Sequence, residues 1–139
     1  MAMMPKRVLH RKQQRGRVKG VAQRGNTVEF GDIGLQSMEP GWISGRQIEA
    51  GRVALTRAVP GAKIYIRIFP HKPLTSQPLE TRMGKGKGEP EYYAATVRPG
   101  TVLYEIGGMP EAESLLALNR ASHKMPVRCR VVRRRQRTR

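Results

Sequence analysis

Both ends of this chain of 139 residues are strongly basic and contain no acid, which limits the part that can fold by itself. Residues 1–25 hold eight Lys and Arg, and residues 126–139 hold seven Arg. All ten acids lie between these ends, so the middle is nearly neutral although the whole chain carries +17. Repulsion extends such ends in water, where they bury too little apolar surface to offset the entropy lost on ordering. We therefore predict a folded body with two cationic arms that become ordered on a polyanion.

Length and composition divide the chain into a basic RNA-binding arm at 1–25, a single domain at 26–132 with a functional loop at 71–90, and an Arg-rich tail at 133–139. A hydrophobic content of 38% suits one domain with a modest core. No apolar run approaches the roughly 18 residues of a spanning helix, and the arms lack the aromatic face of an interfacial helix. The sequence thus favours nucleic acid over a membrane surface as the partner.

Turn residues and hydrophobic spacing predict two helices and several short strands. Ser44 and Gln47 have the spacing of a capping box, and Pro60-Gly61 ends the helix that follows. A second helix begins at Pro110 and ends before Pro126. Alternation predicts strands at 27–30, 34–38, 63–69, 92–98, 101–106 and 127–131. The pair at 92–98 and 101–106 is expected to form a hairpin turned at Pro99-Gly100.

Each predicted element has an apolar face that we expect in the core. In the first helix this face holds Ile48, Gly51, Leu55 and Val59, and in the second it holds Ala112, Leu115, Leu116 and Leu118. In the strand at 63–69 it holds Ile64, Ile66 and Ile68. Cys129 is expected to be a small core residue, and as the only cysteine it excludes an internal disulfide framework and indicates a reducing compartment.

The opposite faces leave two readings open. Arg46 and Arg57 lie nearly opposite the apolar stripe of the first helix, where simple solvation and RNA contact are both open. Tyr65 and Phe69 lie on the outer face of their strand, and either packing against a neighbouring layer or base stacking would suit them.

A glycine-rich basic loop is the most informative motif of the body. Residues 71–90 contain too many Pro and Gly for a helix, and a connection this long is usually functional or disordered. Glycine lets a phosphate approach bare backbone amides, and Lys85 and Lys87 would point to one side of an extended chain. The motif indicates a loop that binds a polyanion, and a flexible surface loop without a ligand is the alternative. It consists of Arg82, Met83, Gly84, Lys85, Gly86, Lys87 and Gly88.

Catalytic motifs are missing from the sequence. Asp32, the one aspartate, sits in a glycine turn, and His10, His71 and His123 lack metal-ligand spacing. Lys87 is followed by Gly88 rather than Ser or Thr, and only one residue separates Gly86 from Gly88, so the loop matches neither the P-loop nor the dinucleotide fingerprint. We predict a non-enzyme with no catalytic residue, cofactor, metal or small-molecule substrate.

An ordered set of motifs from Pro5 to about Val132 resembles the bacterial-type large-subunit ribosomal protein L sixteen family. The set comprises Pro5-Lys6-Arg7, Arg11-Lys12, Arg15-Gly16-Arg17, Phe30-Gly31, Gly34-Leu35, Arg46 to Ala50, Ile64 to Pro70, Lys72-Pro73, Arg82 to Gly88, Pro99-Gly100 and Leu103-Tyr104-Glu105. The resemblance implies an α+β fold of the hammerhead type, with two helices on a mainly antiparallel sheet and extended basic arms at both ends.

The resemblance also implies a structural role in the large ribosomal subunit. It implies binding to large-subunit rRNA, support of tRNA in the aminoacyl site near the peptidyl transferase centre, late subunit assembly and contact with neighbouring ribosomal proteins. The loop Arg82 to Gly88 would point toward the functional centre and tRNA. Charge and resemblance together make the candidate rRNA-binding residues Lys6, Arg7, Arg11, Lys12, Arg15, Arg17, Lys19, Arg24, Arg46, Arg57, Arg133, Arg134 and Arg135.

Departures and alternatives accompany the resemblance. Gly51 stands where the family pattern usually has alanine, which weakens the first helix by about 0.5–1 kcal/mol unless the backbone packs closely there. The turn at 60–62 lacks the basic residues often found there, and the tail is richer in arginine than the pattern requires. A free-standing nucleic-acid chaperone and an RNA-modifying enzyme are the alternative functions. The expected location is a cytoplasmic large subunit, with an organellar ribosome as the alternative.

Overall fold

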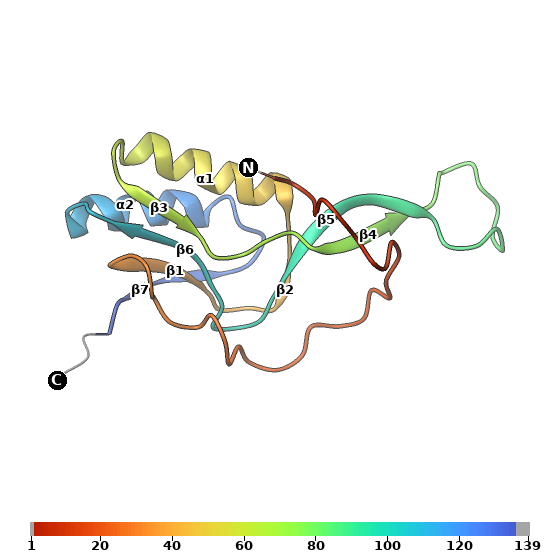
Figure 1. The fold of residues 1–139 in the computed structure, drawn as a ribbon, viewed down its shortest axis with the longest axis horizontal. Helices are drawn as coiled ribbons and strands as arrows, with labels where there is room; N and C mark the ends of the chain where they lie inside the picture. Colours follow the sequence, from red (N-terminus) through yellow and green to blue (C-terminus); the bar gives the residue numbers. More distant parts are fainter. Residues whose placement is uncertain (1, 136–139) are drawn as a thin grey trace.

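The computed structural model describes residues 2–135, which form two antiparallel sheets and two helices (Figure 1). One sheet has the order β3-β6-β1-β7 and the other the order β2-β5-β4. The elements are β1 (Ile33–Ser37), β2 (Gly41–Ser44), α1 (Gly45–Ala58), β3 (Lys63–Ile66), β4 (Lys72–Ser76), β5 (Glu89–Val97), β6 (Val102–Gly107), α2 (Glu111–Ser122) and β7 (Cys129–Arg133). The predicted α+β class with two helices and a mainly antiparallel arrangement is confirmed.

Helix α1 begins and ends where the sequence predicts. The Ser44 hydroxyl accepts a hydrogen bond from the Gln47 amide at 3.3 Å, and the Gln47 side chain accepts one from the Ser44 amide at 2.9 Å. This reciprocal capping box satisfies donors that the first turn leaves unpaired. The helix stops at Ala58, just before Pro60-Gly61.

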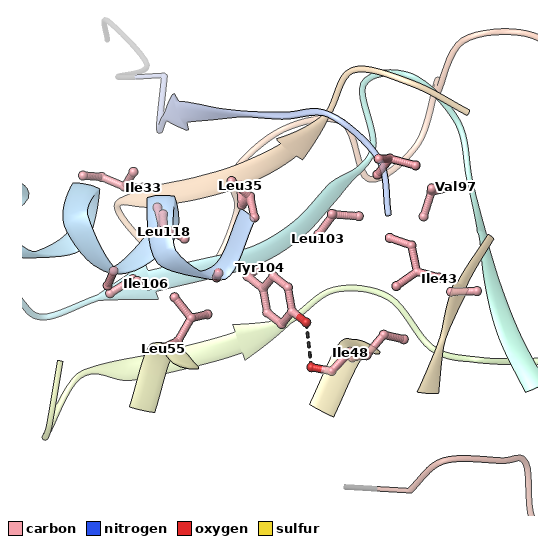
Figure 2. Close-up of a cluster of buried hydrophobic side chains, with 14 of the residues drawn as sticks. Ile33, Leu35, Ile43, Ile48, Leu55, Val97, Leu103, Tyr104, Ile106 and Leu118 are labelled. Atoms are coloured by element: carbon pink, nitrogen blue, oxygen red, sulfur yellow. Dashed lines mark hydrogen bonds between the residues drawn. The ribbon is translucent and has the colours of Figure 1, made fainter. Parts of the chain in front are cut away.

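Both helices cover the same side of the four-stranded sheet, and the core lies between them and it (Figures 1 and 2). Ile48 and Leu55 of α1 are fully buried, as is Tyr104 of β6, whose hydroxyl donates a 2.7 Å hydrogen bond to the Ile48 carbonyl (Figure 2). The core face predicted for the segment at 63–69 is confirmed, because Ile64, Ile66 and Ile68 pack against this cluster, but the strand is shorter than predicted and ends at Ile66.

The predicted core face of α2 is partly wrong. Leu118 is buried, but Leu116 is 65% exposed and Ala112 is exposed as well. The buried stripe instead repeats with helical spacing at Ser114, Ala117, Leu118 and Ala121. Three of these four side chains are small, so the packing of the helix rather than the size of its apolar residues decides which face is buried.

Strand pairing also departs from local expectation. β5 and β6 are consecutive but belong to different sheets, so the predicted hairpin at Pro99-Gly100 is wrong. At this turn Gly100 has a φ of +96° and its amide donates to the Ser37 carbonyl at 2.7 Å, while Pro99 O accepts from the Ala22 amide. The turn also keeps a bond from the Thr101 amide to the Arg98 carbonyl at 3.1 Å, but it is anchored to the end of β1 and to the N-terminal arm, and the strands beyond it do not pair.

The segment at 71–90 is more regular than its composition suggests. Residues Lys72–Ser76 form β4, which pairs with β5, and the irregular part is mainly the loop between Ser76 and Glu89. Pro73 is tolerated because β4 lies at the edge of its sheet, where a missing backbone donor leaves no partner unpaired. The β4–β5 hairpin projects from the body and carries the glycine loop at its tip (Figure 1).

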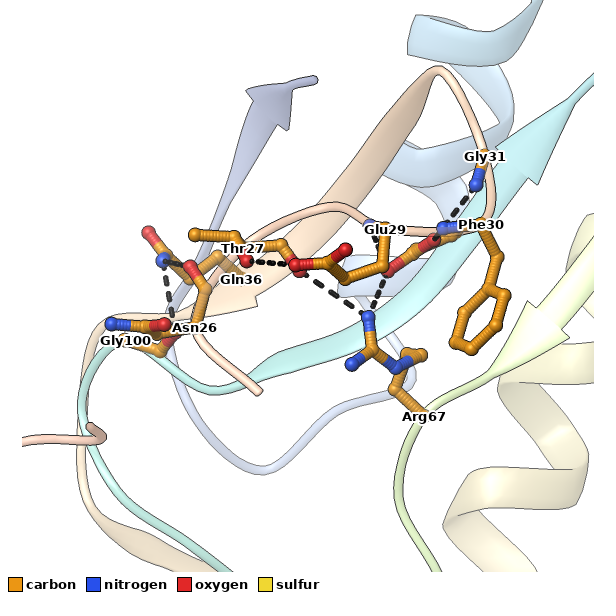
Figure 3. A network of polar contacts seen from close by, with 9 residues as sticks. Asn26, Thr27, Glu29, Phe30, Gly31, Gln36, Arg67 and Gly100 are labelled. Atoms are coloured by element: carbon orange, nitrogen blue, oxygen red, sulfur yellow. Dashed lines mark hydrogen bonds and ion pairs between the residues drawn. The ribbon is translucent and has the colours of Figure 1, made fainter. Parts of the chain in front are cut away.

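The predicted strand at 27–30 is absent, and its backbone bonds to a buried side chain instead (Figure 3). Glu105 on β6 is fully buried and accepts hydrogen bonds from the amides of Glu29, Phe30 and Gly31 at 3.1, 2.6 and 2.8 Å. Arg67, just beyond β3, forms an ion pair with the same carboxylate. A carboxylate with this many donors can remain charged in the interior.

Close packing at Gly51 leads to the first prediction. A methyl group at this position would overlap the Tyr104 hydroxyl and come within 2.9 Å of Met125 Cε. The backbone at Gly51 therefore packs closely, which is the condition under which the sequence analysis does not expect this glycine to weaken the helix. We expect Gly51→Ala to lower the free energy of unfolding by about 1–3 kcal/mol in urea titrations, because overpacking exceeds the gain in helix propensity. Thr56→Ala, at an exposed position of the same helix, is the control, and an equal effect of both variants would contradict the argument.

The Glu105 network leads to the second prediction. Burial raises the pKa of the Glu105 carboxyl, but hydrogen bonds from Gly31, Glu29, Arg67 and Phe30 outweigh burial and leave the pKa below its ordinary value. The stability that this shift contributes is thus complete above the unfolded pKa of about 4.3 and is lost as the pH falls through the folded value.

We expect Glu105→Gln to lower the free energy of unfolding at pH 7 by about 3–5 kcal/mol, because Arg67 loses its buried partner. The stabilities of the variant and of wild type, measured by urea titration from pH 7 downward, should converge as the wild-type carboxylate takes up a proton. Glu111→Gln, which breaks the exposed pair with Arg133, is the matched control and should change stability little. A parallel pH profile for Glu105→Gln and wild type would refute the assignment.

Candidate nucleic-acid interface

The N-terminal arm has no helix or strand, yet it follows a defined path along the body (Figure 1). Near its start, Met3 lies against Gly45 at the beginning of α1, where an added Cβ would come within 3.0 Å of the Met3 carbonyl. Further on, the arm runs beside the β4–β5 hairpin before it returns to the body. The arm exposes all eight of its predicted RNA-binding residues, namely Lys6, Arg7, Arg11, Lys12, Arg15, Arg17, Lys19 and Arg24.

The arm and the glycine loop meet although 75 residues separate their contacts in sequence. The Lys12 ammonium donates to the Lys87 carbonyl at 3.0 Å, and the Lys87 ammonium donates to the Gln13 carbonyl at 2.5 Å. Two basic segments that the sequence offers separately thus form one surface, which we call the arm–loop surface. It comprises residues 11–15 of the arm and Arg82 to Gly88.

A single acid joins this surface. Glu89, at the start of β5, pairs with Arg11 at 2.7 Å and with Lys12 at 3.1 Å. The hydrogen bond from Lys12 holds the pKa of the Glu89 carboxyl below its ordinary value. Sequence reasoning missed Glu89, because an acid beside a Pro carries no local signal of a partner far along the chain.

Trp42 of β2 contacts the middle of the arm through cation–π interactions. The Arg15 guanidinium lies 5.9 Å and the Lys72 ammonium 5.4 Å from the centre of the Trp42 ring. Lys72 also donates to the Arg15 carbonyl at 2.5 Å. The Trp42 indole N–H is buried and has no hydrogen-bond partner among the described residues. Cation–π contacts of this kind are attractive, and they hold the middle of the arm on β2.

The glycine loop is turned rather than extended. Gly84 and Gly86 have φ values of +84° and +85°, which glycine adopts at little cost. Lys85 and Lys87 therefore do not form the same-side pair that an extended chain predicts: Lys87 returns to the arm, whereas Lys85 stays exposed at the tip with Arg82 and Met83.

Comparison with known proteins identifies the family that this arrangement belongs to. The family described as ribosomal protein L16p/L10e matches residues 5–132. The chain belongs to this family. It is 60% identical over 136 residues to the large ribosomal subunit protein uL16 of Rhodopirellula baltica, which covers 97% of this chain and 99% of the relative. It is 55% identical over 131 residues to the large ribosomal subunit protein uL16c of Physcomitrium patens, with 94% and 95% covered. The resemblance drawn from the motifs is confirmed.

The remaining candidate residues of this L16p/L10e protein lie apart from the arm–loop surface. Arg46 and Arg57 are exposed on α1. Arg133 lies in β7 and pairs with Glu111 at 2.6 Å, and the Arg134 amide donates to the Asp32 carbonyl at 2.9 Å, so the predicted tail begins inside the sheet. Arg135 is exposed, and the rest of the predicted tail, residues 136–139, lies outside the described residues.

Three further findings on residues 2–135 of this L16p/L10e protein concern membrane spans, metal ions and the thiol of Cys129. No helix in this range is long and apolar enough to cross a membrane. The same residues contain no group of three or more His, Cys, Asp or Glu that could hold a metal ion. Cys129 is half-buried against the core, and burial raises the pKa of its thiol to about 11, which disfavours the nucleophilic thiolate.

The docking of the arm leads to the third prediction. Trp42 is the only tryptophan of the chain, so its fluorescence reports how well the arm covers it. We expect Glu89→Gln to increase quenching of Trp42 by acrylamide, because Arg11 and Lys12 lose their partner and the arm loosens. Glu91→Gln, an exposed acid on the same strand, should leave quenching unchanged. Equal quenching of wild type and Glu89→Gln would show that Glu89 does not hold the arm.

Proposed function

We propose that this L16p/L10e protein is a structural constituent of the large ribosomal subunit that binds large-subunit rRNA through the arm side of its arm–loop surface. The observation that supports this proposal most directly is the junction of the arm with the glycine loop through Lys12, Lys87 and Glu89. This junction places exposed Lys and Arg side chains on one projecting surface, whose positive charge is complementary to the negative charge of a phosphate backbone. Arginine suits such a role because its planar fork binds phosphate at two points and stacks on bases.

The second part of the proposal concerns tRNA. The loop between β4 and β5 projects furthest from the body (Figure 1), and its residues Arg82, Met83 and Lys85 are exposed. We assign this tip to the neighbourhood of the aminoacyl-site tRNA and the peptidyl transferase centre, and we assign the arm to rRNA. Late subunit assembly and contacts with neighbouring ribosomal proteins follow from a place in the subunit. The protein performs no reaction in this scheme, and peptide-bond chemistry belongs to the RNA.

The different settings of the two loop lysines lead to the fourth prediction. Lys85 is exposed at the tip, so Lys85→Ala should weaken binding of tRNA to the aminoacyl site of assembled subunits without changing how tightly the protein holds large-subunit rRNA. Lys87→Ala should weaken rRNA binding as well, because the Lys87 side chain also fixes the arm through Gln13. Filter binding across a salt series measures both effects, and each lost phosphate contact should reduce the salt slope by about 0.9.

Two outcomes would contradict the proposal. A nearly flat salt response of the wild-type chain would remove its electrostatic basis. A chain that leaves the large subunit in a moderate salt wash, and coats many RNAs equally, would support a free-standing nucleic-acid chaperone instead.

A further inference from the structure

A second basic surface lies between the end of the arm and the β5–β6 connection. It is a groove of about 760 Å³, whose lining includes Arg24, Arg67, Phe69, His71, Thr96 and Arg98. We call it the Phe69 groove. Its volume lies within the range of sites that hold small ligands, so it can admit one nucleotide. Of its lining, only Arg24 belongs to the residues that the sequence analysis assigns to RNA.

The walls of the Phe69 groove are fixed by the backbone. On one side the Ala22 amide donates to the Pro99 carbonyl and the Gly25 carbonyl accepts from the Val102 amide, both at 2.9 Å. These two bonds flank Arg24 and hold it against the body. On the other side Arg67 is fixed through its amide, which donates to Leu103 O at 2.9 Å. The groove is therefore preformed, and a ligand need not order its walls.

The charge of the groove selects for an anion. Among its described lining residues none is acidic. Arg67 is neutralised by Glu105, whereas Arg24 and Arg98 form no ion pair within residues 2–135. A larger groove beside β7 differs, because its arginines are interspersed with Glu29, Asp32 and Glu111. Two unneutralised guanidinium groups in the Phe69 groove suit one phosphate or two adjacent ones.

Phe69 gives this anion site an aromatic surface. Phe69 is 45% exposed, while Tyr65, the other aromatic on the same face of the chain, is stacked on Phe30 at a centroid distance of 5.7 Å. The two residues are equivalent in the sequence pattern but differ in the structure, because Tyr65 stacks on another ring and Phe69 leaves much of its surface open. An exposed aromatic ring and guanidinium groups lining one groove are the combination on which unstacked bases of RNA lie.

We propose that the Phe69 groove binds one unstacked nucleotide of single-stranded RNA, with its base on the Phe69 ring and its phosphate between Arg24 and Arg98. This inference rests on the proposed RNA-binding function and adds to it a second contact, separate from the arm–loop surface and of a different kind. The phosphate contacts proposed for the arm–loop surface need no free base, whereas the Phe69 groove requires a base that has left its helix. A duplex presents no such base.

The test compares two RNA probes with the full-length chain. One is an unstructured oligouridine, and the other is a duplex with the same number of phosphates. We expect Phe69→Leu to weaken binding of the oligouridine about tenfold, the loss of one base–aromatic stack, and to leave duplex binding unchanged. Phe69→Tyr should retain the wild-type affinity because it keeps the flat ring. Tyr92→Leu removes a 43% exposed aromatic outside the groove and should change neither affinity.

A second pair of variants tests the phosphate contact. Arg98→Ala should lower the salt slope of oligouridine binding by about 0.7, the value for one phosphate of a single strand. Arg120→Ala, an exposed arginine on α2, should leave it unchanged. Because Phe69 and Arg98 are exposed, these variants should unfold at the wild-type temperature, which circular dichroism verifies.

The outcomes separate this inference from the function on which it rests. Wild-type affinity of Phe69→Leu for oligouridine, or equal losses on both probes, would overturn the Phe69 groove while salt-dependent binding of the wild-type chain leaves the arm–loop surface standing. Wild-type affinity of Phe69→Leu for oligouridine is also the result expected if the groove binds a segment of a neighbouring protein rather than RNA. Absence of salt-dependent binding to either RNA by the wild-type chain would overturn both proposals.

Discussion

The arrangement of the functional surfaces depends on the hydrogen bonds and the ion pair of the buried Glu105 carboxylate. It binds the backbone of residues 29–31 and the guanidinium of Arg67 (Figure 3). It therefore joins the segment that follows the arm to the connection between β3 and β4. The Arg67 guanidinium also lies 5.0 Å from the centre of the Phe30 ring and donates to the Thr27 carbonyl. One charge in the interior thus sets where the arm enters the body and where the wall of the Phe69 groove stands.

Features encoded by neighbouring residues could be predicted from the sequence. The capping box of α1 needs only Ser44 and Gln47, and the alternation of Ile64, Ile66 and Ile68 needs only a strand with one buried face. The arm's lack of secondary structure follows from its composition. In each case the residues that make the interaction lie within a few positions of one another, and one physical rule decides the outcome.

Features that depend on distant partners could not be predicted. Residues 27–30 have the composition of a strand, but the carboxylate of Glu105 replaces the strand that would otherwise bond to them. Residues on either side of Pro99-Gly100 have the pattern of a hairpin. The turn is closed by a bond from the Thr101 amide to the Arg98 carbonyl, but Gly100 and Pro99 bond to Ser37 and Ala22 and the two strands join different sheets. The junction of Lys12 with Lys87 belongs to the same class, as does Glu89. Local propensity is a weak guide wherever a partner far along the chain competes for the same groups.

The way the arm is held agrees with a role in binding RNA. Its ion pairs with Glu89 are largely exposed to solvent, and exposed pairs contribute little to stability and are screened by salt. The cation–π contacts with Trp42 and the backbone bonds of Lys12 and Lys87 give the arm its direction without neutralising most of its charge. An arm held by stronger, buried pairs would have to break them before it met a phosphate. Weak docking therefore lowers the entropy lost when the arm is ordered and leaves its cations available.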